Sequence, residues 1–192
     1  MTAALRCFST PSSIRPEPLI AALAVPVLCL QFGATYVSAA DADAYLEEAR
    51  QFIADGETQA AIIQLKNALQ SDPAHLQARL MLASLHLRNA DGAAAAKEFA
   101  RARDLGAAPG DWLPGYANAL MLQGQFQMLL DEARVDEALT VAQRADLLAL
   151  RGNAHLALRQ IESATADYDA ALAIASGHPM AGLGKARILL VE

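Results

Sequence analysis

Cysteine is almost missing from this sequence: Cys7 and Cys29 are the only two, and both lie within the first 40 residues. The rest of the chain can therefore form no disulfide and offers no thiol for catalysis or metal binding. Aromatic residues make up only 5% of the chain and β-branched residues are sparse, whereas Ala and Leu supply most of its 54% hydrophobic content. Because Ala and Leu are strong helix formers, this composition argues against a β-sheet core and predicts an all-α fold.

Basic clusters and recognisable catalytic motifs are also missing. The formal net charge is −6 and no basic patch interrupts the sequence, so nucleic acid is not an expected partner. No Ser or Thr has a partnered His at a spacing typical of a nucleophile, and no glycine-rich phosphate loop follows a predicted strand. We therefore predict no catalytic residue, no metal and no cofactor, and we expect that the protein is not an enzyme.

The first 40 residues differ in composition from the rest. Arg6 and Arg15 precede an apolar run over residues 19–32, and the small residues Ser38-Ala39-Ala40 close the segment. This order predicts a secretory signal peptide over residues 1–40, cleaved near Ala39/Ala40. The alternative is an uncleaved anchor, although the apolar run is short for a membrane span of ~20 residues. Membrane association is expected only through this segment, if it is not cleaved.

A repeat dominates the remainder of the chain. Small residues recur at spacings of 34, 34, 35 and 34, at Ala49, Ala83, Ala117, Gly152 and Ala186. A second register follows at fixed offsets, as with Ala61, Leu65 and Ala68 in the first repeat. Two antiparallel helices pack closely where small residues lie at their crossing, and one such pair cannot bury its apolar face alone. The pattern therefore predicts hairpins of a helix A and a helix B that stack into one continuous core.

Turn residues separate the predicted helices. Asp55-Gly56, Asp91-Gly92 and Gly124 lie between the A and B helices, and Asp72-Pro73 ends the first B helix. The third repeat departs from this pattern, because Asp136 stands where a small residue is expected and charges gather around it. We predict a shortened third B helix, a break near residues 132–137 and a longer helix that enters the fourth repeat. The break is either ordinary repeat degeneracy or a bend that reshapes the surface of the A helices.

The pattern resembles the 34-residue tetratricopeptide repeat, and the first repeat carries the resemblance almost throughout. The matching residues are Tyr45, Ala49, Phe52, Ala61, Leu65, Ala68 and Pro73. The resemblance implies a right-handed α-solenoid of about four and a half helix-turn-helix repeats over residues 42–192. The repeats fall near residues 42–75, 76–109, 110–144 and 145–178, and a lone helix follows at 179–192.

In the tetratricopeptide family the A helices line a concave groove that binds peptides. The resemblance implies the following candidate groove residues here: Leu46, Arg50, Ile53, Leu80, Ser84, Leu87, Asn118, Met121, Ala149, Asn153 and Leu156. Asn118 and Asn153 share one register, and a side-chain amide there supplies a donor and an acceptor for a bound peptide backbone. A solvated polar residue is the alternative interpretation. The expected partner is an extended peptide or a helix of another protein.

The four histidines and the single tryptophan are interpreted as structural. His86 and His155 lie two repeats apart, which places them about 20 Å from each other at ~10 Å per helix layer, too far to share a metal ion. We expect both to be packing residues. His75 and His178 lie beside proline at the ends of B helices and are expected to be solvated, and Trp112 is expected to pack between repeats.

A narrower resemblance concerns the PrsT-type tetratricopeptide proteins of bacterial exosortase (PEP-CTERM) systems. Phrases such as Ala61-Ile-Ile-Gln-Leu-Lys-Asn-Ala-Leu and Gln125-Phe-Gln-Met-Leu-Leu-Asp-Glu carry it. It implies an exported scaffold for protein–protein interaction in a Gram-negative envelope, periplasmic or outer-membrane associated and linked to exopolysaccharide or protein sorting. Those proteins are longer and often lipid-anchored, whereas here Leu28, not a small residue, precedes Cys29.

The expected fifth A helix, over residues 181–191, is largely apolar and ends in Ala186, Ile188, Leu189, Leu190 and Val191. Terminal repeats of a solenoid need a polar outer face. Two interpretations follow. Either the chain is a truncated structural segment of a longer tetratricopeptide protein, whose missing repeats cap this helix and which has no binding role of its own, or a partner or a second copy caps it.

Overall fold

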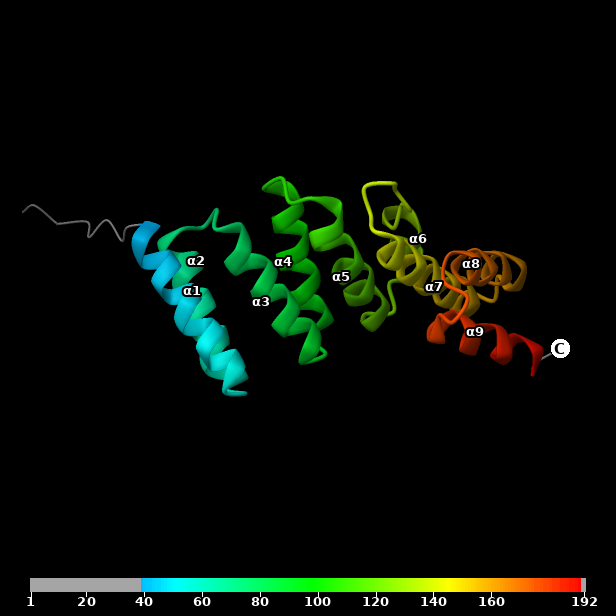
Figure 1. Ribbon diagram of the computed structural model, residues 1–192, viewed down its shortest axis with the longest axis horizontal. Helices are drawn as coiled ribbons and strands as arrows, with labels where there is room; N and C mark the ends of the chain where they lie inside the picture. The colour runs from blue at the N-terminus through cyan, green and yellow to red at the C-terminus, as the bar shows by residue number, and fades with distance from the viewer. Residues whose placement is uncertain (1–38, 191–192) are drawn as a thin grey trace, which may run out of the picture. The chain divides into compact units, whose positions relative to one another are not determined.

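All regular structure in the described part of the chain is helical. The computed structural model describes residues 39–190, which form these helices: α1 (Ala39–Ala54), α2 (Thr58–Ser71), α3 (Leu76–Arg88), α4 (Gly92–Asp104), α5 (Pro109–Leu122), α6 (Phe126–Glu132), α7 (Val141–Ala157), α8 (Ile161–Ile174) and α9 (Pro179–Leu189) (Figure 1). The predicted signal segment lies outside the described residues, except that Ala39 and Ala40 begin α1. Among residues 39–190 we find no helix with the length and apolarity to cross a membrane.

The helices form successive hairpins. We call α1, α3, α5, α7 and α9 the A helices and α2, α4, α6 and α8 the B helices; each A helix from α1 to α7 packs against the B helix that follows it. B helices also pack against the next A helix, as α4 does on α5, and neighbouring A helices from α3 onward contact one another (Figure 1). The prediction of an all-α solenoid of helical hairpins is confirmed.

Small residues lie at the helix crossings, as the repeat predicts. Ala49 of α1 and Ala61 and Ala68 of α2 are fully buried in one cluster of side chains. The fourth repeat has Gly152 at the position of Ala49, where an added Cβ would lie 2.5 Å from Cε1 of Tyr168. Ala186 differs from its equivalents because it is exposed. No B helix packs on this side of α9 in the described residues, so its small side chain has nothing to pack against.

Phe99 and Tyr168 each fill the space between two A helices. They occupy equivalent positions on α4 and α8 and are almost completely buried. Each rests on a glycine of the next A helix, since an added Cβ on Gly115 or Gly184 would lie 2.2 Å from Cζ of the corresponding ring. The glycines therefore let each ring lie directly on a helix backbone, which joins one repeat to the next.

The A helices α1, α3, α5 and α7 end in the same way. Gly56, Ala90, Gly124 and Arg159 have positive φ values of 79°, 57°, 68° and 60°. In each case the next residue donates its backbone N–H to a carbonyl of the last helical turn, as Glu57 does to Phe52 at 2.8 Å. From the sequence, the second of these turns was assigned to Asp91-Gly92, of which only Asp91, the N-cap of α4, lies between the helices. Ala90 makes the turn, and Gly92 begins α4, where a Cβ would lie 2.8 Å from the Ala119 carbonyl oxygen.

The third B helix is short, as predicted. α6 ends at Glu132 after 7 residues, and the 17-residue α7 begins at Val141. The Thr140 hydroxyl accepts from Gln143 N, and Gln143 Oε1 accepts from Thr140 N, which caps α7. Gln143 Nε2 also donates to the Gly110 carbonyl at 2.8 Å. That carbonyl has no partner within α5, because Pro114 has no N–H to donate to it.

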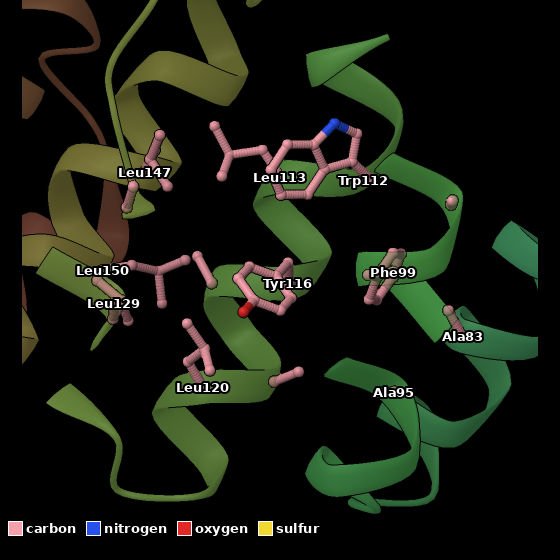
Figure 2. Packing of buried hydrophobic residues seen from close by; sticks show 14 of the residues in the cluster. Ala83, Ala95, Phe99, Trp112, Leu113, Tyr116, Leu120, Leu129, Leu147 and Leu150 are labelled. Atoms are coloured by element: carbon pink, nitrogen blue, oxygen red, sulfur yellow. The ribbon is translucent and has the colours of Figure 1, made fainter. Parts of the chain in front are cut away.

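The largest cluster of buried side chains surrounds α5 (Figure 2). Trp112 packs edge-to-face on Tyr116, with ring centroids 5.7 Å apart, and Arg103 of α4 lies 5.5 Å from the Trp112 ring. The prediction that Trp112 packs between repeats is confirmed. Burial raises the pKa of Tyr116, as does Glu132, while Arg103 lowers it in part. The hydroxyl therefore stays protonated at neutral pH.

Candidate functional site

Two rows of side chains remain accessible along the A helices. The polar row consists of one residue from each A helix at the register of Asn118: Arg50, Ser84, Asn118, Asn153 and Arg187. The apolar row lies three positions further along each helix: Ile53, Leu87, Met121, Leu156 and Leu190. Residues three apart on a helix share a face, so each A helix contributes one polar and one apolar side chain to the same surface.

The other three candidate groove residues lie deeper. Leu46 and Ala149 belong to the core, with exposed fractions of 3% and 0%, and present no side chain to a ligand. Leu80 is half-buried and packs on the core around α5. These three residues occupy equivalent positions, whose side chains pack between helices and not on the accessible face. Leu46 and Ala149 are therefore not groove residues, and Leu80 lies at most at its edge.

The accessible face is hollowed between repeats three and five. Two adjacent cavities of about 290 and 350 Å³ share Leu156, Ala157 and Arg187. The first is also lined by Met121, Phe126 and Asn153, and the second by Arg159 and Ile161. We call these two cavities together the C-terminal groove. It lies where α5 and α7 turn into their B helices and where α9 runs beside them.

Asn118 and Asn153 each use one of their two polar side-chain atoms in a hydrogen bond within the chain. Asn118 Nδ2 donates to the Pro114 carbonyl at 3.1 Å, and Asn153 Oδ1 accepts from the Tyr168 hydroxyl at 2.7 Å. Within residues 39–190, Oδ1 of Asn118 and Nδ2 of Asn153 have no hydrogen-bond partner. One asparagine therefore offers a free acceptor and the other a free donor, a narrower capacity than the sequence implied for each.

The groove carries positive charge. Arg159 and Arg187 are exposed, and neither forms an ion pair or hydrogen bond through its side chain within the described residues. Burial raises the pKa of the Tyr168 hydroxyl, and Arg187 lowers it in part. The hydroxyl thus remains a donor to Asn153 at neutral pH, and Arg187 places a guanidinium close to this pair. An anionic group would find two unpaired cations beside an apolar floor.

Several groove residues escaped the sequence analysis. Phe126, Ala157, Arg159 and Ile161 lie at the turns between A and B helices, where helix periodicity gives no information about which side chain faces a cavity. Arg187 could have been found, because it follows Asn153 by the 34-residue period. Ser84 and Arg50 complete the same row, but Ser84 donates to its own helix at Leu80 and Arg50 pairs with Glu47.

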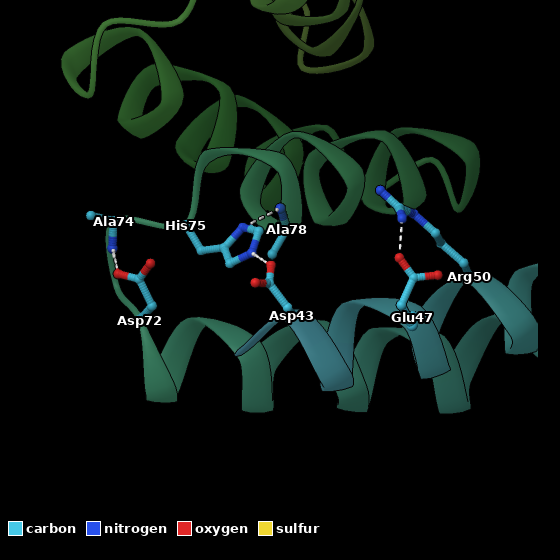
Figure 3. A network of polar contacts seen from close by, with 7 residues as sticks. All are labelled: Asp43, Glu47, Arg50, Asp72, Ala74, His75 and Ala78. Carbon is cyan, nitrogen blue, oxygen red and sulfur yellow. Dashed lines mark hydrogen bonds and ion pairs between the residues drawn. The ribbon is translucent and has the colours of Figure 1, made fainter. Parts of the chain in front are cut away.

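The expectation that His75 and His178 are solvated was wrong. Their side chains are only 14% and 9% exposed, because each caps the next A helix and reaches back to the A helix before it. His75 Nδ1 accepts from the Ala78 N–H, and Nε2 lies 3.1 Å from Asp43 Oδ1 (Figure 3). His178 repeats the arrangement with Ala181 and Asp146, the latter at 2.9 Å. We call each His with its Asp an Asp–His clamp.

Replacing His178 by alanine is expected to lower the free energy of unfolding by about 1–2 kcal/mol, because α9 loses its N-cap. His178→Asn keeps a capping side chain but cannot reach Asp146, so we expect it to recover most of that loss. Urea unfolding monitored by circular dichroism measures both variants. Equal losses in the two would show that the cap is not the source of the effect.

The remaining histidines also have partners. His86 Nδ1 lies 3.6 Å from Asp91 Oδ2, and His155 Nδ1 lies 2.6 Å from Gln160 Oε1. Both side chains are largely buried, at 15% and 16% exposure, in agreement with the packing role that the sequence predicts. In residues 39–190, no three His, Cys, Asp or Glu side chains gather in a way that could hold a metal ion.

Comparison with known proteins supports the fold. The sequence matches no family model and no curated protein. A solved structure from the functional characterization of Pseudomonas aeruginosa pilF is 22% identical, with a TM-score of 0.62 over 79% of this chain and 68% of that one. A tetratricopeptide repeat protein from Parabacteroides merdae is 19% identical, with a TM-score of 0.65 over 78% of this chain and 59% of that one. The chain therefore has the α-solenoid fold of tetratricopeptide-repeat proteins.

Proposed function

We propose that this chain is a non-catalytic scaffold that holds an extended segment of a partner protein along the polar and apolar rows. The observation that carries the proposal is the C-terminal groove, where both rows border the same two cavities. An extended peptide presents alternate side chains to opposite sides. The side chains on one side can pack on Met121 and Leu156, while the peptide backbone faces the side-chain amides of Asn118 and Asn153. The residues that line the two cavities do not form a recognisable catalytic arrangement.

The chemistry of the groove indicates the kind of segment that fits. Its floor is apolar, formed by Met121, Phe126 and Leu156, and favours a segment with at least one large apolar side chain. Arg159 and Arg187 favour a carboxylate next to it, because guanidinium groups bind carboxylates with two parallel hydrogen bonds. The partner segment that we propose therefore contains a large apolar residue next to an acidic residue or next to its own C-terminal carboxylate.

The test compares matched surface substitutions in the intact protein. The groove variant is Arg187→Ala with Met121→Glu, and the control is Arg88→Ala with Leu122→Glu. Arg88 ends α3 much as Arg187 ends α9, and Leu122 is the exposed neighbour of Met121 outside the groove. We expect the groove variant to weaken binding of a partner isolated from the producing cells by about tenfold or more, from loss of an ion pair and an apolar contact.

The partner is first identified by affinity isolation with the unaltered chain, and its dissociation constant is then measured for each variant. Circular dichroism shows whether each variant retains its helices. An unchanged dissociation constant for the groove variant, or an equal loss in the control, would overturn the groove as the binding surface.

The cellular setting is part of the same proposal. We propose that the chain is exported, acts in the periplasm or at the outer membrane of a Gram-negative cell, and serves an envelope assembly such as exopolysaccharide export or PEP-CTERM protein sorting. The signal-like composition of residues 1–40 and the PrsT-like phrases support this setting. Mass spectrometry of the protein from fractionated cells tests it: a mature chain that retains residues 1–40 in the cytoplasmic fraction would contradict export.

A second candidate follows from α9. Leu183, Leu189 and Leu190 are exposed by 65%, 71% and 85%, and Ala186 lies among them without a packing partner in the described residues. A structural segment whose further repeats cover this face would bury these side chains and have no independent binding role. The intact mass of the protein from cells distinguishes the two candidates, because this one requires a longer polypeptide.

A further inference from the structure

A separate cavity of about 450 Å³ lies between two B helices. Its lining residues are Lys66, Leu69 and Gln70 of α2, Pro73 of the loop between α2 and α3, Arg79, Leu82 and His86 of α3, and Glu98 and Arg101 of α4. None of them belongs to the C-terminal groove or to the two rows on the A helices. The cavity is thus independent of the proposed peptide-binding surface.

A buried ion pair forms the wall of this cavity. Arg79 and Glu98 are 7% and 8% exposed, and Arg79 Nη1 donates to Glu98 Oε2 at 2.5 Å. Arg101 Nη1 donates to the other oxygen, Oε1, at 2.8 Å, and Arg79 Nη2 donates to the Pro73 carbonyl. Both oxygens of the carboxylate are therefore engaged by arginines, and the wall is held in one arrangement by these contacts.

The cavity carries an excess of positive charge. Lys66 is exposed and forms no ion pair or hydrogen bond through its side chain within residues 39–190. Arg101 has an exposed side chain with donors that Glu98 does not use. Glu98 is the only carboxylate among the lining residues, against three cations. His86 faces Asp91, which is not part of the lining. In a chain of net charge −6, such a local excess of cations is not a consequence of overall composition.

We propose that this cavity binds a small organic anion, with its carboxylate or phosphate group between Lys66 and Arg101 and its apolar part against Leu69, Pro73 and Leu82. The volume lies within the range of small-molecule sites, and such sites combine apolar walls with a few placed polar groups. The buried Arg79–Glu98 pair fixes the position of Arg101, so little side-chain order has to be gained on binding.

Nuclear magnetic resonance titration of the full chain tests this site, with benzoate and phenyl phosphate as probes of the two anionic groups. Acetate and inorganic phosphate are the matching probes without an apolar part. We expect saturable shifts of backbone amides in α2, α3 and α4 with at least one aromatic probe, and weaker binding of its small counterpart. Shifts with benzoate alone assign a carboxylate, and shifts with phenyl phosphate alone assign a phosphate.

Lys66→Ala is the diagnostic variant, because the exposed Lys66 side chain forms no ion pair or hydrogen bond within the described residues. We expect it to weaken binding by about fivefold, the size of one solvent-exposed ion pair. Lys97→Ala, an exposed lysine of α4 outside the cavity, is the control and should leave binding unchanged. No saturable shift with either aromatic probe, equal binding of the small anions, or equal loss in the two variants would overturn the proposal.

Discussion

Glu98→Ala is expected to lower the free energy of unfolding by about 3–5 kcal/mol, because it leaves the buried Arg79 guanidinium without its carboxylate. Glu98 lies on α4 and Arg79 on α3, and both are more than nine-tenths buried. In such a site the cost of an unpaired charge exceeds the value of the pair itself. Urea unfolding at neutral pH measures the loss directly.

Two further variants separate the effect of the unpaired Arg79 charge from the effect of losing the contact between Glu98 and Arg101. The double substitution Arg79→Met with Glu98→Leu removes both charges, and we expect it to recover most of the stability that Glu98→Ala loses. Arg101→Ala removes only the half-exposed partner of Glu98 and should cost less than about 1 kcal/mol. If the double variant were as unstable as Glu98→Ala, the loss of side-chain packing, and not the unpaired charge of Arg79, would explain the lower stability.

Tyr168→Ala is expected to lower the free energy of unfolding by about 3–5 kcal/mol, the usual range for deleting a buried aromatic ring. Tyr168 is fully buried between Gly152 of its own hairpin and Gly184 of α9, and its hydroxyl donates to Asn153. Removal of the ring leaves a cavity between repeats and an asparagine without this partner. Urea unfolding measures the loss, and hydrogen exchange would show whether α9 opens first.

Substitutions of glycines in α9 test the packing of this ring, because the effect of Gly184→Ala on stability should reverse when the ring is removed. Gly184→Ala places a Cβ 2.2 Å from Tyr168 Cζ and should destabilise the chain by about 1–3 kcal/mol. Gly182→Ala on the same helix has nothing within 4 Å of the new Cβ, and we expect it to stabilise by up to about 1 kcal/mol. In the Tyr168→Ala background Gly184→Ala should also stabilise. Destabilisation there would show that the ring is not what Gly184 accommodates.

Helix periodicity made most of the fold predictable. Small residues with a 34-residue period located the crossings of A and B helices, and the irregular charges around Asp136 located the break after α6. The same register also places Arg187 in the polar row, although the sequence analysis did not name it. It failed for Leu46 and Ala149, which are only 3% and 0% exposed, because a shared register does not show which face of a helix its neighbours cover.

Side-chain contacts between helices could not be read from the sequence. His75 and Asp43 are 32 residues apart, and Arg79 and Glu98 are 19 apart, so no helix period joins them. The Asp–His clamps depend on the way a capping side chain turns toward the preceding A helix. Positive φ at Ala90 and Arg159 was likewise unpredictable, since most turns of this kind use glycine.

The shortness of α6 has a consequence for how the chain distributes its stability. A solenoid is held together by the coupling of each hairpin to its neighbours, so its cooperativity is limited by its weakest junction. α6 has one buried residue, Leu129, whereas α2 has four. We therefore expect the repeats before and after the third B helix to unfold with the least cooperativity at this junction, and Phe126, the first residue of α6, lines the C-terminal groove.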